Sequence, residues 1–168
     1  DYYNSIISPF YSYSTGRTKE TLRSSQVTCR DIDDDGYIEI PEDTSSKKQS
    51  SEITSQNWVN YGNTVLSHKC YSFSCKRDGY ILVIDDDDFS KVKANYDSES
   101  RKLTIINKKN KSNVFEIVTL INSNYSVNDP KYKDYTMIMK NSGFVYLAKV
   151  NKSSDIDINI QTLKDMIK

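Results

Sequence analysis

The segment VKANYDSESRKLTIINKKNKSNVFEIVTLI, residues 92–121, decides the fold class that the sequence predicts. Three strand-like runs, 92–96, 102–106 and 114–121, are separated by the polar turns DSES and KKNK. Short polar gaps between such runs favour hairpins, in which neighbouring strands are antiparallel. The segment therefore predicts neighbouring strands of an antiparallel sheet.

The same pattern continues on both sides of this segment. Further strand-like runs occupy residues 57–61, 66–73, 80–84, 135–139 and 144–150. Behind a capping Asp155, apolar residues recur at helical spacing: Ile156, Ile160, Leu163 and Ile167. The chain has many β-branched residues and Tyr, and these favour strands over helices. We expect an α+β fold with a mainly antiparallel sheet and few helices.

Length and charge exclude several classes of protein. The 168 residues suit one domain of ordinary size, or a small module fused to a smaller domain. Lys plus Arg and Asp plus Glu both number 23, so the net charge is zero. General nucleic-acid binders and binders of anionic membranes need a surplus of basic residues, so the balanced charge argues against both classes. No apolar run is long enough to predict a transmembrane segment.

The motif DIDDDGYIE, residues 31–39, carries the clearest chemical signal. Ca²⁺ takes six to eight oxygen ligands at about 2.3–2.6 Å. Carboxylates at alternate positions, Asp31, Asp33 and Asp35, converge on one cation if the backbone coils around it. Gly36 permits the sharp turn that follows, where a Cβ would clash. The motif predicts a metal site, with Ile38 anchoring the loop to the core; the alternative is a solvated acidic turn.

Two families share this spacing. An EF-hand loop would place a bidentate acid at its twelfth position, which is Glu42 here, but it needs a helix on each side. The flanks are instead strand-like, so the loop more closely resembles the strand–loop–strand calcium sites of FG-GAP or VCBS repeats. That resemblance implies a carbonyl ligand from Tyr37 and an outward-pointing Asp34. Its implied side-chain ligands are Asp31, Asp33, Asp35 and Glu39.

A second resemblance covers residues 79–168. Their order of strands, hairpin and terminal helix resembles the α/β/α sandwich of PsbP-like proteins and of small bacterial lipoproteins built on it. The resemblance implies a binding module rather than an enzyme.

The sequence predicts three parts of the chain. Residues 1–41 form an arm, a calcium-binding β-hairpin whose second strand ends at Pro41, because proline cannot donate to a ladder. Residues 42–56 are polar and Ser-rich and predict a linker or loop. Residues 57–168 form the α+β domain that ends in a helix. No signal peptide opens the chain, and residues 1–4 look like the cut edge of a longer protein.

The cysteines and the single histidine leave further alternatives open. Cys70 and Cys75 could close a small hairpin as a disulfide in an oxidising compartment. A zinc site from Cys29, His68, Cys70 and Cys75 has an unusual spacing. A Cys–His pair for catalysis is disfavoured because His68 lies two residues from Cys70 on one strand face.

The acidic run at residues 85–88 could be a second cation site, but it lacks the alternation and glycine of the 31–39 motif. It is therefore expected to be an exposed turn whose last aspartate caps a short helical turn.

These features favour a non-catalytic, calcium-stabilised binding or structural module of a larger secreted or surface-anchored bacterial protein. Its partner would be a protein or a glycan. Two alternatives remain: an accessory or catalytic domain of a secreted hydrolase, and a small-ligand carrier. A buried acid pair in a cleft away from residues 31–39 would favour the hydrolase, and an apolar pocket between sheet and helix would favour the carrier.

Overall fold

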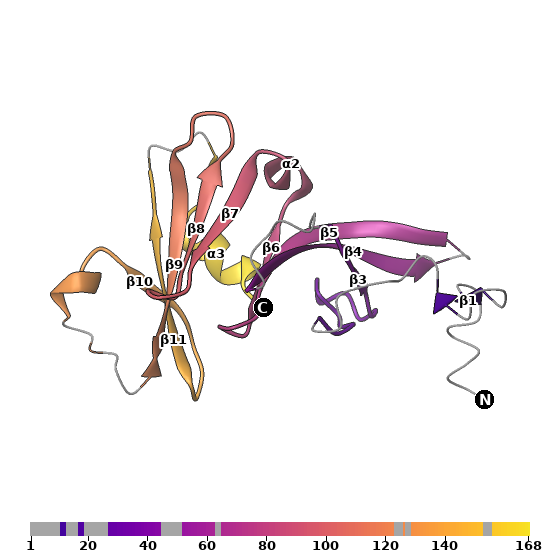
Figure 1. The fold of residues 1–168 in the computed structure, drawn as a ribbon, viewed down its shortest axis with the longest axis horizontal. Coiled ribbons are helices and arrows are strands. Elements are labelled where there is room, and N and C mark those ends of the chain that lie inside the picture. The colour runs from indigo at the N-terminus through magenta and orange to yellow at the C-terminus, as the bar shows by residue number, and fades with distance from the viewer. Residues whose placement is uncertain are drawn as a thin grey trace.

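Two antiparallel sheets form the framework of the described part of the protein (Figure 1). The structure is a computed structural model, and it describes residues 11–12, 17–18, 27–44, 52–62, 65–122, 126, 129–152 and 156–168. A separate two-stranded ribbon joins β1 (Tyr11–Ser12) and β2 (Arg17–Thr18).

The first sheet has four strands in the order β3-β4-β5-β6. Its strands are β3 (Ile40–Asp43), β4 (Ile53–Gly62), β5 (Val65–Cys75) and β6 (Tyr80–Ile84). The second sheet has five strands in the order β10-β11-β9-β8-β7. Its strands are β7 (Val92–Asp97), β8 (Lys102–Asn107), β9 (Asn113–Ile121), β10 (Thr136–Lys140) and β11 (Phe144–Val150).

Short helices fill the connections. Helix α2 (Asp86–Phe89) links the two sheets, and the 3₁₀ turn η3 (Pro130–Tyr132) precedes β10. Helix α3 (Ile160–Met166) contacts β6, β10 and β11 and buries Leu163. None of the described helices is long and apolar enough to cross a membrane.

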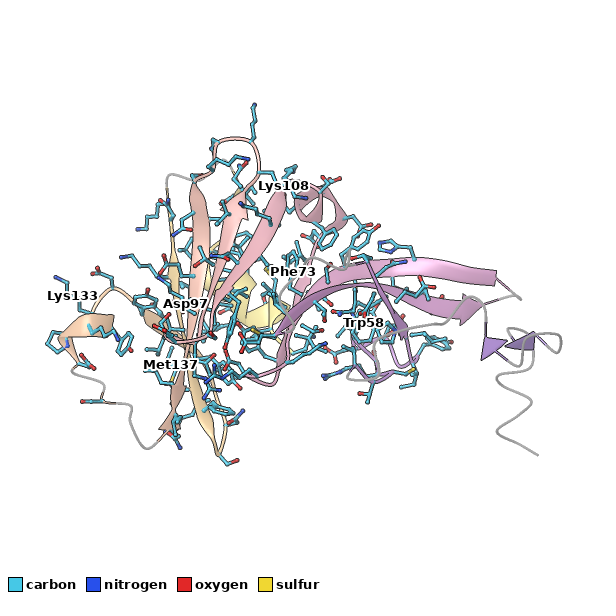
Figure 2. The ribbon with its side chains drawn as sticks, viewed as in Figure 1. Trp58, Phe73, Asp97, Lys108, Lys133 and Met137 are labelled. Atoms are coloured by element: carbon cyan, nitrogen blue, oxygen red, sulfur yellow. The ribbon has the colours of Figure 1, made fainter. Side chains whose placement is uncertain are left out.

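The two faces of β6 serve two different apolar clusters. Tyr80, Leu82 and Ile84 point into the main core, which they share with the second sheet. The intervening Ile81 and Val83 pack on a smaller cluster of Val27, Ile32 and Trp58. Figure 2 shows Phe73 of β5 between the sheets and Trp58 on the side of the smaller cluster. The alternation of side chains along a strand therefore connects the core to the 27–39 segment.

An ion pair joins the two sheets. Asp78, in the turn between β5 and β6, is fully buried. Its Oδ1 lies 2.7 Å from Nε and 2.6 Å from an amino group of Arg101, next to β8. Its Oδ2 accepts the hydroxyl of Tyr96 at 2.8 Å, and its carbonyl accepts that of Tyr146 at 2.7 Å.

The strand predictions are confirmed in their order and type. The quoted segment forms β7, β8 and β9, and a mainly antiparallel fold with few helices is correct. The PsbP-like α/β/α sandwich is not what the described residues show, because two sheets share the main core and only short helices accompany them.

The terminal helix starts later than expected. It begins at Ile160 behind Asn159, whose side chain accepts the backbone N–H of Thr162 at 3.0 Å. Ile156 and Ile158 are buried before the helix begins, and Asp155 lies outside the described residues.

Residues 1–10, 13–16 and 19–26 of the predicted arm lie outside the described residues, and from Val27 onward the structure differs from the expected hairpin. In place of a hairpin, the residues from Val27 to Glu39 form one antiparallel bridge, between Arg30 and Glu39. Pro41 does not end a strand, since β3 continues to Asp43. Proline is tolerated there because β3 is an edge strand of the sheet.

The expected linker is partly strand. Residues 42–43 belong to β3 and residues 53–56 to β4, which pair with each other, while residues 45–51 lie outside the described part. The division of the chain into an arm at 1–41, a linker at 42–56 and a domain at 57–168 stays a prediction.

Candidate metal centre

The acidic loop of residues 31–39 is held by an apolar contact with the four-stranded sheet and by hydrogen bonds between its own two ends. Ile32 is fully buried and packs with Val27 against Trp58. At the other end, the backbone groups of Arg30 and Glu39 exchange hydrogen bonds of 2.9 and 3.2 Å. The loop thus has a closed neck and one apolar anchor, and the acids lie between them.

Hydrogen bonds within the loop coil its backbone. Both carboxylate oxygens of Asp31 accept backbone N–H groups, from Asp35 at 3.1 Å and from Gly36 at 2.9 Å. Asp35 accepts the N–H of Tyr37 at 2.9 Å. Asp34 and Gly36 take positive φ angles of 61° and 90°, which aspartate tolerates and glycine adopts without strain. Gly36 is favoured by this angle and not by crowding, since nothing lies within 4 Å of a Cβ placed there.

Four carboxylates meet as a result. One oxygen from each of Asp31, Asp33, Asp35 and Glu39 lies within 4.8 Å of the other three. Oxygens bound to one Ca²⁺ at about 2.3–2.6 Å are separated by no more than roughly 5 Å. The four oxygens therefore fit around a single cation. Within the described residues, this is the one group of three or more His, Cys, Asp and Glu side chains that is close enough for such a site.

Glu39 is the buried member of this acidic cluster. Its side chain is fully buried, and its Oε2 accepts the N–H of Ile32 at 3.0 Å. Its Oε1 is buried and has no hydrogen-bond partner. Burial, together with the charges of Asp33 and Asp35, raises the pKa of Glu39. An unpaired buried carboxylate oxygen is costly, and a cation in the cluster would compensate it.

Two lysines distant in sequence neutralise part of the loop. Lys69 Nζ lies 2.6 Å from Asp35 and 3.0 Å from Asp33, and its hydrogen bonds raise its own pKa and lower the pKa of Asp35. Lys168 Nζ pairs with Asp34 and lowers the pKa of that carboxyl. No local motif identifies either lysine, because each is brought to the loop by the tertiary fold.

The other predicted site residues are placed as follows. Asp34 points outward, as expected, with its side chain 75% exposed. Glu42 lies apart from the acidic cluster, in β3, where it accepts a hydrogen bond from Asn57 at 3.0 Å. The side chain of Tyr37 is exposed. The expectation that Ile38 anchors the loop is wrong, because Ile38 is 61% exposed and Ile32 holds that role.

The cysteines form neither of the predicted arrangements. All three are free, and Cys70 and Cys75 lie on the single strand β5. Five residues of strand span about 16 Å, whereas a disulfide needs Cα atoms within about 7 Å. Burial raises the pKa of both thiols to about 12, so they are protonated near neutral pH. His68 contacts Asn57 and Asp86 and no cysteine.

The run of four aspartates forms the start of α2. The helix begins at Asp86 behind Asp85, whose side chain makes no capping hydrogen bond, and Asp88 pairs with Lys91 at 2.9 Å. The run is thus an exposed helical turn, as expected, but its last aspartate is not the cap.

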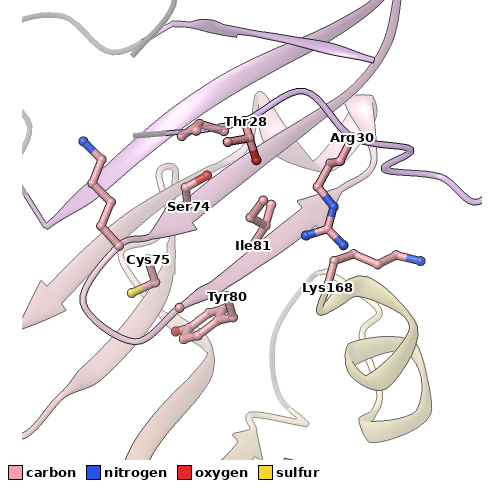
Figure 3. A pocket seen from close by; sticks show the side chains of 10 residues that line it. Thr28, Arg30, Ser74, Cys75, Tyr80, Ile81 and Lys168 are labelled. Carbon is pink, nitrogen blue, oxygen red and sulfur yellow. The ribbon is translucent and has the colours of Figure 1, made fainter. Parts of the chain in front are cut away.

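A cavity of about 370 Å³ opens beside the acidic loop. It lies between residues 27–30 and the β5–β6 turn, and Figure 3 shows Arg30 and Lys168 along one side of it. The hydroxyl side chains of Thr28 and Ser74 also line it. This mixed lining differs from the apolar pocket between sheet and helix that a small-ligand carrier requires.

Replacing Glu39 with glutamine should stabilise the metal-free protein at neutral pH. The pKa of Glu39 in the folded state lies above the usual 4.5, so the folded protein holds the proton more tightly than the unfolded chain does. The protonated carboxyl therefore contributes to the free energy of unfolding below pH 4.5, and this contribution is lost as the pH rises through the raised pKa. The Glu39→Gln side chain is neutral throughout and still accepts from Ile32. In EDTA at about pH 7 we expect its melting temperature to exceed wild type by roughly 2–4 °C, with the difference vanishing near pH 4. A lower melting temperature at both pH values would contradict this.

No family model matches the chain, and neither the curated proteins nor the solved structures include a match.

Proposed function

We propose that the chain is a calcium-stabilised, non-catalytic binding or structural module in which Ca²⁺ is held by Asp31, Asp33, Asp35 and Glu39. The observation that carries this proposal is the buried, unpartnered Oε1 of Glu39 in a cluster of four converging carboxylates. The carbonyl of Tyr37 completes the ligand set. Oxygen ligands with several negative charges suit a hard divalent cation, and Ca²⁺ accepts the irregular geometry of such a loop.

The role of the ion is structural. Neutralising the acidic cluster removes repulsion among its carboxylates, and the coiled loop then holds Ile32 against Trp58. Because the ligands come together only in the folded chain, the free energy of binding becomes free energy of folding. The site does no chemistry in this proposal.

The proposed setting is extracellular. Weak calcium sites of extracellular modules have dissociation constants of about 10⁻⁴–10⁻³ M and are filled at the calcium concentrations outside cells. The module would belong to a larger secreted or surface-anchored bacterial protein, for example a lipoprotein, and would contact a protein or glycan partner.

The hydrolase alternative has less support. It calls for a buried acid with a raised pKa in a cleft away from residues 31–39. Among the described residues, the carboxyl whose pKa is raised is that of Glu39, which belongs to the loop itself. The small-ligand carrier would use the cavity beside Arg30. Both polar and apolar side chains line this cavity.

Calorimetric titration tests the proposal. We expect Ca²⁺ to bind wild type, and Asp33→Ala to weaken binding by at least about tenfold because one charged ligand is removed. Asp34→Asn is the matched control: it removes a charge from the same loop and keeps a residue that tolerates the positive φ, but its side chain points away from the acidic cluster. Equal calcium heats for wild type and Asp33→Ala would overturn the proposal.

A further inference from the structure

Lys69 reaches the acidic loop through an irregularity in the sheet. In the pairing of β4 with β5, Trp58 lies opposite Cys70 and the next residue, Val59, lies opposite His68. Lys69 is thus the extra residue of a β-bulge. Bulges re-aim a side chain that regular alternation would place elsewhere. Here the re-aimed ammonium meets Asp33 and Asp35 of the loop.

The ammonium and a bound cation would compete for the same two carboxylates, those of Asp33 and Asp35. Nζ lies 3.0 Å from Asp33 Oδ2 and 2.6 Å from Asp35 Oδ2. A divalent cation at about 2.3–2.6 Å from oxygens of the same carboxylates would lie close to the ammonium, and the two positive charges would repel each other. Binding of the ion therefore favours release of the ammonium from at least one of the two carboxylates. The side chain is 24% exposed, so it has a path to solvent.

We propose that Lys69 is an affinity-determining residue of the metal centre, a tethered internal cation that divalent ions displace. The inference rests on the proposed calcium site and adds a function for a residue outside the loop. In the absence of the ion, Lys69 neutralises part of the acidic cluster and keeps the loop folded. When the ion binds, the loss of these ion pairs reduces the net free energy of binding. The calcium affinity is therefore lower than the four carboxylates alone would give.

Substitution by methionine tests this directly, since Met keeps an unbranched apolar stem and removes the charge. By calorimetry we expect Lys69→Met to bind Ca²⁺ about tenfold more tightly than wild type, or about 1.4 kcal/mol. Lys168→Met is the matched control: it removes the same charge beside the loop, but its partner Asp34 is not a ligand. Its affinity should change by less than about twofold, since its ammonium pairs with a carboxylate outside the acidic cluster and acts on the ion only at longer range, where salt screens it.

The melting temperatures of Lys69→Met and wild type, compared with and without calcium, provide a second test. In EDTA, Lys69→Met should melt below wild type, because Asp33 and Asp35 lose their partner. In saturating Ca²⁺ the order should reverse or the difference should disappear, because the ion replaces the ammonium.

Wild-type protein provides a test that does not depend on a variant folding. Amine-reactive labelling read by mass spectrometry should modify Lys69 faster in Ca²⁺ than in EDTA, while Lys91, paired with Asp88 away from the loop, should not change. Unchanged labelling of Lys69, or equal or weaker calcium binding by Lys69→Met, would overturn the inference while calcium still binds. Absence of calcium binding in both proteins would instead overturn the proposed function.

Discussion

Replacing Asp78 with alanine is expected to lower the free energy of unfolding by about 3–5 kcal/mol. The carboxylate is fully buried and accepts two N–H groups of Arg101 and the hydroxyl of Tyr96. Its removal leaves the guanidinium, which is only 17% exposed, without its counter-ion. Chemical denaturation of the two proteins measures the loss.

An exposed ion pair provides the control for this prediction. Asp88 and Lys91 lie 2.9 Å apart on the surface, and Asp88→Ala should cost less than about 1 kcal/mol. The double variant Asp78→Ala/Arg101→Ala should lose less stability than the sum of its single variants, because the second substitution removes the stranded charge. A loss below about 1 kcal/mol for Asp78→Ala would show that the ion pair does not hold the two sheets together.

The order of strands could be predicted because each strand carries a local signal. In β8, Leu103 and Ile105 alternate with partly exposed residues, and the turn after them is polar. The pairing of two sheets around one core carries no such signal. It depends on contacts like Asp78 with Arg101, which are separated by 23 residues and are specified by the turn geometry of both partners.

Pro41 shows how a local rule can mislead. Proline removes one donor from a ladder, so it was expected to end a strand. Tertiary pairing overrides this, because an edge strand leaves one set of donors unused and Pro41 pairs with Trp58 there. The sequence therefore predicts correctly that a strand leads into Pro41, but it places the end of that strand wrongly.

The candidate site also has parts that local sequence predicts and parts that depend on the tertiary fold. The alternation of Asp31, Asp33 and Asp35 with Gly36 predicts the coiled loop, since those positions form its own hydrogen bonds. The choice of Glu39 over Glu42 follows from the bridge between Arg30 and Glu39, which turns Glu39 inward. Lys69, 34 residues from Asp35, depends on a bulge that no sequence pattern announces.

Calcium should raise the melting temperature of wild type by about 5–10 °C when its concentration is 100 times the dissociation constant. An ion that binds only the folded state adds about 2.7 kcal/mol at that concentration. For a chain of 150–250 residues, each kcal/mol shifts the midpoint by about 2–4 °C. Scanning calorimetry in Ca²⁺ and in EDTA measures the shift, and Asp33→Ala should show little of it.

Hydrogen exchange locates the effect within the fold. The amides of Asp35, Gly36 and Tyr37 donate to carboxylates of the loop itself, so closing the loop around an ion should slow their exchange. Amides of β8 lie in the middle of the other sheet and should not respond under conditions where only local opening is measured. The contrary result would be a melting temperature that EDTA does not change, in protein shown to hold calcium beforehand. Calcium binding would then leave the folding equilibrium unchanged, so the ion could not be what holds Ile32 against Trp58. Its role would instead be to bind a partner.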